Sequence, residues 1–246
     1  MFTEILFIIF LIVFLSIFCF FASGIIHELG HVITGLLHGW EFYIFIVGPI
    51  GIKKNENRLQ LYFEKDVSLW GGAGGTFPSD EKADNMKILS RVLLAGPIAS
   101  ITAGFIFLLL SFIHFSMIFL LLGAITTVMG IACLLPLKTG IMYSDGKRWL
   151  RLHSEGQGKD EEIALYKMMM RSLFKKDASP LEYDDFAPLL NAELPAIQYY
   201  GYYYLYEWYS IRNDEENKQK TLEKLHQMKK NVPKIIVEDC EIPDPS

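Results

Sequence analysis

The chain has 246 residues, of which 51% are hydrophobic and 21% charged, and its formal net charge is −5. A negative net charge argues against nucleic acid as a partner. The cysteines Cys19, Cys133 and Cys240 are spaced neither as a disulfide framework nor as a cysteine-based metal site. Residues 1–52 contain no Lys or Arg and residues 92–137 no charged residue, so apolar and charged segments are separate. This predicts an integral membrane protein with a soluble appendage.

The first predicted element is one long helix over residues 5–38. A helix of that length extends about 50 Å, more than the roughly 30 Å of hydrocarbon requires, so we expect it to tilt, bend or project from one leaflet. Its only early charge is Glu4, whereas a cleaved signal peptide begins with basic residues. We therefore interpret it as a retained span that ends at Gly39.

Residues 40–70 form a predicted β-rich loop. Phe42–Val47 is a β-branched and aromatic run, and Arg58–Glu64 alternates partly with a period of two. The two segments predict a β-hairpin or a small sheet. The glycines of Gly71–Gly75 predict a segment too flexible for a regular element.

Two further spans are predicted over residues 90–111 and 115–136. Small residues at the start of the first one would let the helices approach closely, and Pro97 would kink it. Together with residues 5–38 these spans predict a three-span transmembrane core over residues 1–150.

Residues 151–246 predict a cytosolic, mainly α-helical tail. Amphipathic helices are expected at about 160–176, 196–212 and 215–230. The second of these is rich in tyrosine, and we expect its aromatic side chains to pack within a helical bundle. The fold class is therefore a mainly α membrane protein with a small β element.

The distribution of Lys and Arg predicts the orientation in the membrane. Seven of these residues lie in the loop 39–91 and four in residues 138–151, whereas the N-terminus and the turn 111–116 contain none. The positive-inside rule then places the N-terminus outside and the loop 39–91 and the tail in the cytosol.

The chemistry concentrates at His27-Glu28-Leu29-Gly30-His31, which has the pattern H-E-x-x-H. Histidines at i and i+4 share one helical face and can bind one ion, while the glutamate is placed to take a proton from the attacking water. Ionisable side chains in an apolar span cost several kcal/mol together, on the order of 2–3 kcal/mol each, and are functional by default. The alternative is a hydrated helix end at the interface.

Two histidines leave zinc short of a third protein ligand. Asp145 is the candidate, because it follows the third span at the depth where the first helix ends. Its alternative role is to cap a helix that begins at Lys147. The chemistry of the sequence alone leaves both roles open.

These motifs resemble those of the site-2 protease family of intramembrane zinc metalloproteases. That family pairs H-E-x-x-H with a downstream Asn-x-x-Pro…Asp-Gly motif, and here Cys133-Leu134-Leu135-Pro136 and Asp145-Gly146 follow in order. Leu94–Ser100 is similar to the Ala-Gly-Pro segment of the family's middle span. The resemblance implies His27, His31 and Asp145 as ligands of one zinc ion per chain, Glu28 as the catalytic base, and Cys133 and Pro136 as substrate-binding residues.

Two features depart from the family pattern. Cys133 stands where the family usually has Asn, whose role is to hold the substrate or its developing oxyanion, and cysteine is a weak donor. Eight residues, rather than the usual four, separate Pro136 from Asp145.

The expected function is an intramembrane zinc metalloendopeptidase that hydrolyses a peptide bond of a membrane-embedded or membrane-associated protein or peptide near the cytosolic leaflet. An extended substrate would add to the edge of the strand-like segment 41–64, near Ile46. The resemblance and the compact layout suggest a bacterial plasma membrane. The alternative is a catalytically impaired or non-proteolytic membrane scaffold whose tail binds a protein partner. A prenyl-protein type of protease ranks lower, because it would need a Glu as third ligand and more spans.

Overall fold

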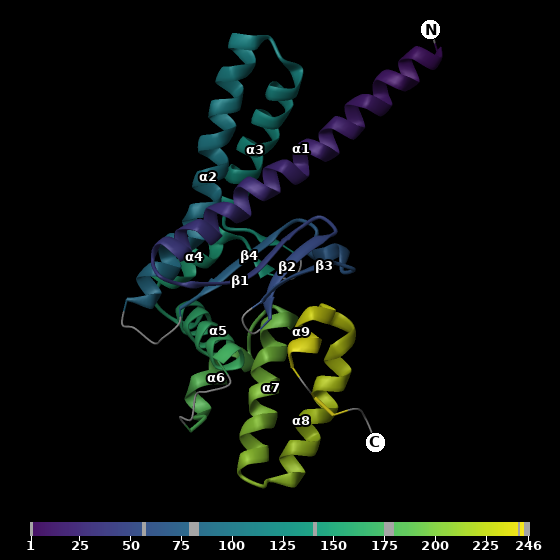
Figure 1. The fold of residues 1–246 in the computed structure, drawn as a ribbon. Helices are drawn as coiled ribbons and strands as arrows, with labels where there is room; N and C mark the ends of the chain where they lie inside the picture. Colours follow the sequence, from purple (N-terminus) through teal and green to yellow (C-terminus); the bar gives the residue numbers. More distant parts are fainter. Residues whose placement is uncertain are drawn as a thin grey trace. The chain divides into compact units, whose positions relative to one another are not determined.

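The computed structural model describes residues 2–55, 58–78, 84–139, 142–174, 180–240 and 242–243. The chain divides into two compact units (Figure 1). The first comprises residues 1–137 and 144–147, and the second comprises residues 138–143 and 148–246. As predicted, the chain is mainly helical with a small antiparallel sheet.

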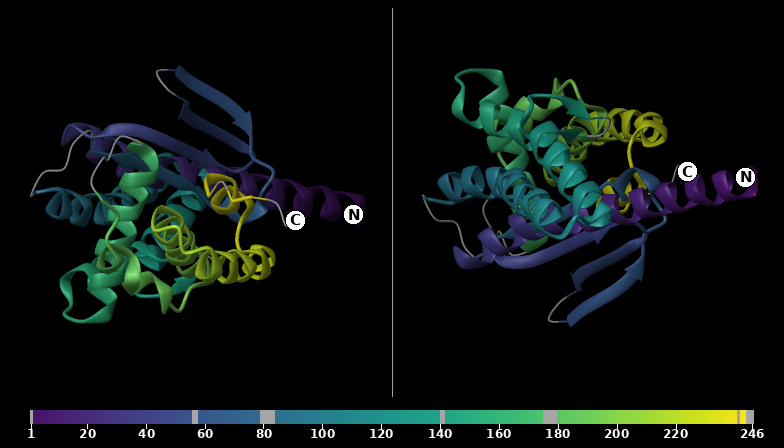
Figure 2. Two further views of the ribbon diagram at one scale, coloured as in Figure 1. Left: turned by 90° about the horizontal axis from the view of Figure 1, so that it is seen from below. Right: turned by 90° about the horizontal axis from the view of Figure 1, so that it is seen from above.

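Three helices of the first unit are long and apolar enough to cross a membrane: α1 (Phe2–Leu37), α2 (Asn85–His114) and α3 (Met117–Leu134). They correspond to the three predicted spans, although α2 begins earlier and continues through Pro97. Side chains on the N-terminal half of α1 are exposed, whereas buried positions begin at Cys19. In Figures 1 and 2 this N-terminal half extends away from the α2–α3 hairpin.

Small residues bring α2 and α3 together. A β-carbon on Gly130 would lie 2.8 Å from the carbonyl oxygen of Pro97, and one on Gly123 would lie 2.8 Å from the backbone nitrogen of Leu108. Neither glycine could carry a side chain without separating the helices. Helices in a bilayer associate through close backbone contacts of this kind, because burying apolar surface does not favour their association there.

A four-stranded antiparallel sheet follows α1. Its strands are β1 (Glu41–Val47), β2 (Ile50–Asn55), β3 (Arg58–Phe63) and β4 (Ala73–Phe77), in the order β3-β2-β1-β4, and a short 3-10 helix, η1 (Val67–Leu69), precedes β4. The sheet is larger than a hairpin, because the predicted flexible segment Gly71–Gly75 supplies much of β4. That prediction was wrong because Gly74 and Gly75 let the strand lie where a β-carbon would meet the side chains of Glu28 and Ile44 at 2.8 and 3.1 Å.

The second unit begins with the short strands β5 (Lys138–Thr139) and β6 (Met142–Tyr143). Helix α4 (Asp145–His153) starts in the first unit and ends in the second. The remaining elements are α5 (Gln157–Phe174), α6 (Tyr183–Leu190), α7 (Pro195–Ile211), α8 (Glu215–Met228), the 3-10 helix η2 (Lys229–Asn231) and α9 (Lys234–Asp239). The predicted helices near 160–176, 196–212 and 215–230 thus correspond to α5, α7 and α8. Helix α6, which contains Pro188, lies between the first two and was not predicted.

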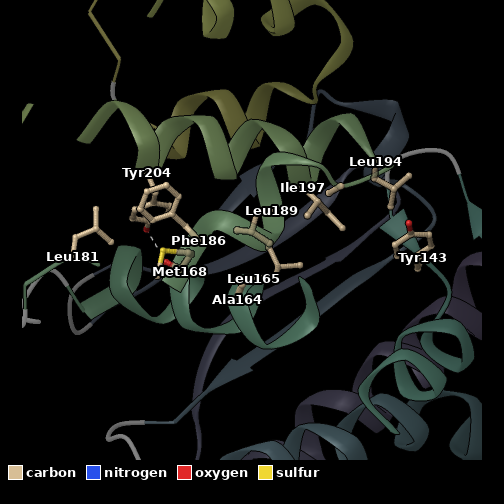
Figure 3. Packing of buried hydrophobic residues seen from close by; sticks show 11 residues of the cluster. Tyr143, Ala164, Leu165, Met168, Leu181, Phe186, Leu189, Leu194, Ile197 and Tyr204 are labelled. Carbon is tan, nitrogen blue, oxygen red and sulfur yellow. Dashed lines mark hydrogen bonds between the residues drawn. The ribbon is translucent and has the colours of Figure 1, made fainter. Parts of the chain in front are cut away.

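Buried apolar side chains hold the second unit together (Figure 3). Phe186, Leu189 and Leu194 are fully buried in one cluster. Tyr204 reaches it from α7 and donates a hydrogen bond of 2.7 Å to the carbonyl oxygen of Met168. The aromatic residues of α7 therefore pack within a helical bundle, as predicted.

Candidate metal centre

His27 and His31 lie one turn apart on α1 and are both buried. Their Nε2 atoms are 3.3 Å apart. The spacing of four residues produces this arrangement, because side chains at i and i+4 lie on the same helical face.

Asp145 is the first residue of α4, and its carboxylate faces both histidines. Its Oδ2 lies 3.1 Å from Nε2 of His27 and 3.5 Å from Nε2 of His31. The capping interaction falls to the preceding residue, since Ser144 Oγ accepts a hydrogen bond from the backbone N–H of Lys147. The carboxylate of Asp145 is therefore directed at the histidines instead of at the helix end.

The contact between Gly146 and the last turn of α3 sets the position of Asp145. A β-carbon on Gly146 would overlap the carbonyl oxygen of Leu134, so only glycine lets α4 begin this close to α3. The longer spacing between Pro136 and Asp145 is absorbed by the β5–β6 pair. Leu137 closes its base, because its carbonyl accepts from the N–H of Ser144 and its own N–H donates to Ser144 Oγ, both at 3.0 Å.

Helix α2 orients both imidazole rings. His31 Nδ1 donates to the carbonyl oxygen of Val92 at 2.7 Å, and His27 Nδ1 lies 3.0 Å from Ser100 Oγ. A carbonyl only accepts, so His31 must carry its proton on Nδ1, which leaves Nε2 free to bind a metal. Gly96 makes room for this contact, since its β-carbon would lie 2.6 Å from Cε1 of His31.

Val92 and Ser100 were not among the residues identified from the sequence. Groups that hydrogen-bond the other ring nitrogen of a metal-binding histidine fix its tautomer and the direction of its ring. The available signal was the position of Ser100 within Leu94–Ser100, the segment already noted for its Ala-Gly-Pro pattern.

The three donor atoms fit a zinc ion. Their separations of 3.1, 3.3 and 3.5 Å match the roughly 3.3 Å between two ligands of a tetrahedral zinc with bonds of about 2.0–2.1 Å. Two imidazole nitrogens and one carboxylate oxygen are also donors that zinc accepts. Burial acts to raise the pKa of Asp145, but its hydrogen bonds with His27 and His31 outweigh this effect and hold the pKa below its usual range. The carboxyl group is therefore ionised, as a ligand must be.

Glu28 lies beside this triad and is buried, with 7% of its surface exposed. The backbone N–H of Gly74 on β4 donates to its carboxylate. Gly72 and Gly74 line the carboxylate so closely that a β-carbon on Gly74 would lie 2.8 Å from its Oε2. The glycine-rich strand thus holds a buried carboxylate next to the proposed metal ligands.

Comparison with protein-family models gives a match to peptidase family M50 over residues 15–241. The chain belongs to this family. M50 peptidases are the site-2 proteases, membrane-embedded zinc metalloproteases. No curated protein and no solved structure matched the chain.

The structure places the other residues singled out from the sequence in different surroundings. Cys133, in the last turn of α3, is close: its Sγ, a ligand atom of His27 and one of Asp145 all lie within 4.8 Å of one another. Pro136 is exposed beyond the end of α3. Ile46 is fully buried in β1, which pairs with both β2 and β4, so it does not offer the free edge that was expected there. His38, seven residues after His31, contacts the carbonyl oxygen of Thr34 and Arg91.

Proposed function

We propose that this M50 peptidase is an intramembrane zinc endopeptidase that uses one zinc ion per chain. His27, His31 and Asp145 bind the ion, and Glu28 is the general base. The observation that carries the proposal is the convergence of two buried imidazole nitrogens and a partly buried carboxylate oxygen at zinc-ligand spacing beside a buried glutamate. The substrate is a membrane-embedded or membrane-associated protein or peptide.

Zinc bound there would polarise the scissile carbonyl and acidify the attacking water. Glu28 accepts the proton of that water and returns it to the leaving nitrogen. Gly74 orients the Glu28 carboxylate through its backbone N–H, and Ser100 and Val92 orient the two imidazoles. Glu28 and both imidazoles are buried, which limits the access of bulk water and strengthens their electrostatic interactions.

The reaction is proposed to occur near the cytosolic leaflet of a bacterial plasma membrane. His27 lies ten residues before the C-terminal end of α1, about 15 Å along the helix. The loop that follows contains most of the Lys and Arg of the first unit, which favours the cytosolic side. The N-terminus would then lie outside and the tail in the cytosol.

A substrate must be extended to expose its backbone, and β4 is the strand that would receive it. Within the described residues β4 pairs with β1 on one side and with no strand on the other. Strand addition to β4 would bring the substrate backbone alongside Gly74 and therefore next to Glu28.

The test measures zinc per chain and cleavage of a membrane-anchored model substrate. Wild-type protein is expected to hold about one zinc and to cleave, Glu28→Gln to hold zinc without cleavage, and Asp145→Ala to lose both. His38→Ala is the matched control on the same helix and should retain both. Absence of zinc from well-folded wild type, or its retention in Asp145→Ala, would contradict the proposed site.

A further inference from the structure

We propose that Cys133 is a fourth protein ligand of the metal in the resting enzyme, where its thiolate occupies the position that the attacking water needs. The inference rests on the proposed zinc site of His27, His31 and Asp145. It assigns to Cys133 a role in holding the enzyme dormant until a substrate enters.

The sulfur of Cys133 lies close to two of the proposed metal ligands. Cys133 Sγ, a ligand atom of His27 and one of Asp145 lie within 4.8 Å of one another. In a tetrahedral site with a zinc–sulfur bond of about 2.3 Å, sulfur lies about 3.5 Å from the nitrogen and oxygen ligands. The sulfur would have to approach these two ligands by about 1 Å to complete the site. It would also have to move toward His31, which is not in this cluster.

The backbone around Cys133 keeps the sulfur close to Asp145. Cys133 precedes Leu134, whose carbonyl is in contact with Gly146, and Gly146 follows Asp145. The last turn of α3 and the first turn of α4 are therefore fixed against each other. This contact therefore holds Cys133, the candidate fourth ligand, close to Asp145, the third ligand.

The cysteine side chain is also chemically suited to bind zinc. Zinc binds cysteine thiolate strongly, whereas catalytic sites keep one position open for water. A set of two histidines, one aspartate and one cysteine would be closed, as in a structural site. With asparagine at residue 133, the fourth coordination position of the metal would stay open. The cysteine found here therefore changes the resting state of the site.

The exchange of ligands balances in atoms and charge. When the sulfur–metal bond forms, one water leaves the metal and the thiol loses its proton, which Glu28 accepts. When the site opens, the sulfur takes a proton back and a water returns. An entering substrate would favour the open form by occupying the space beside the metal.

The test uses full-length protein in which cobalt(II) replaces zinc, because cobalt reports its ligands by absorption. Ligand-field bands show that cobalt is bound in a tetrahedral site, and a separate sulfur-to-cobalt charge-transfer band shows a bound thiolate. Wild type is expected to show both. Cys133→Ser should lose the charge-transfer band and keep the ligand-field bands, and Cys19→Ser, a buried cysteine outside the cluster, should keep both.

The outcomes separate this inference from the proposed function. Ligand-field bands without a charge-transfer band in wild type would overturn the role of Cys133 and leave the zinc site standing. A charge-transfer band that persists in Cys133→Ser would also overturn it. No cobalt binding in wild type would overturn both. Cys133→Asn should cleave the model substrate several-fold faster than wild type at equal metal content, and a rate no higher than wild type would count against dormancy.

Discussion

Gly146 lies against Leu134 so closely that a β-carbon would overlap the Leu134 carbonyl oxygen. In Gly146→Ala the start of α4 must move away from α3, and Asp145 moves with it. Overpacking of this kind costs about 1–3 kcal/mol, so zinc affinity should fall by about tenfold or more. Competition with a chelator measures this affinity. Gly158→Ala, where the new β-carbon meets only the Arg151 side chain at 3.5 Å or more, should bind zinc like wild type.

Ser100 supports His27 through a hydrogen bond of 3.0 Å to Nδ1. Ser100→Ala removes it and leaves the ring free to turn. Zinc affinity should therefore drop by about 10- to 100-fold, as when the hydrogen-bond partner of a metal-binding histidine is removed. Ser111→Ala is the control, because Ser111 is a buried serine on the same helix whose hydroxyl donates to the carbonyl of Leu108. Equal zinc affinities in the two variants would show that Ser100 does not position the ligand.

Gly74 on β4 is expected to position the catalytic base Glu28 and not to affect metal binding. In Gly74→Ala the β-carbon would press on Oε2 of Glu28, so cleavage should fall by about 10- to 100-fold while zinc content is unchanged. Gly71→Ala places its β-carbon in open space and should cleave normally. Loss of zinc in Gly74→Ala, or equal cleavage by the two variants, would contradict this assignment.

The sequence predicted the elements whose patterns are local. Long uncharged apolar runs indicated the spans that became α1, α2 and α3, and H-E-x-x-H placed His27 and His31 on one helical face. The third metal ligand could only be proposed. Asp145 can face the histidines because Ser144, and not Asp145, caps helix α4.

The parts that the sequence did not predict depend on contacts between distant segments. Gly71–Gly75 was interpreted as flexible because glycine disfavours strands, yet Gly72 and Gly74 allow β4 to lie beside Glu28. Ile46 was expected at an edge because nothing in its own strand reveals that β4 pairs on the far side of β1. The hydrogen bond between Ser100 and His27 likewise joins two helices, and no periodic pattern in the sequence indicates it.

In the second unit, Tyr199 and Tyr204 on α7 provide a matched pair of buried tyrosines. Tyr204 donates a hydrogen bond to the Met168 carbonyl, whereas the Tyr199 hydroxyl has no partner among the described residues. Tyr204→Phe should lower the free energy of unfolding by about 0.5–1.5 kcal/mol, the net value of one hydrogen bond. Tyr199→Phe should leave it unchanged or raise it, because an unpaired buried hydroxyl is removed. Urea unfolding at pH 7 measures both, and equal losses would contradict the assigned contacts.

The same tyrosines predict an alkaline limit for this helical bundle. Burial raises the pKa of Tyr199 to about 12 and also raises the pKa of Tyr204 above its usual range, whereas an unfolded tyrosine ionises near about 10. Because the folded pKa exceeds the unfolded one, this contribution to stability is complete below pH about 10 and is lost as the pH rises through about 12. Circular dichroism during an alkaline titration should show α-helix loss in this window. Tyr199→Phe should shift that loss to higher pH, and an unchanged titration curve would show that its ionisation does not limit the fold.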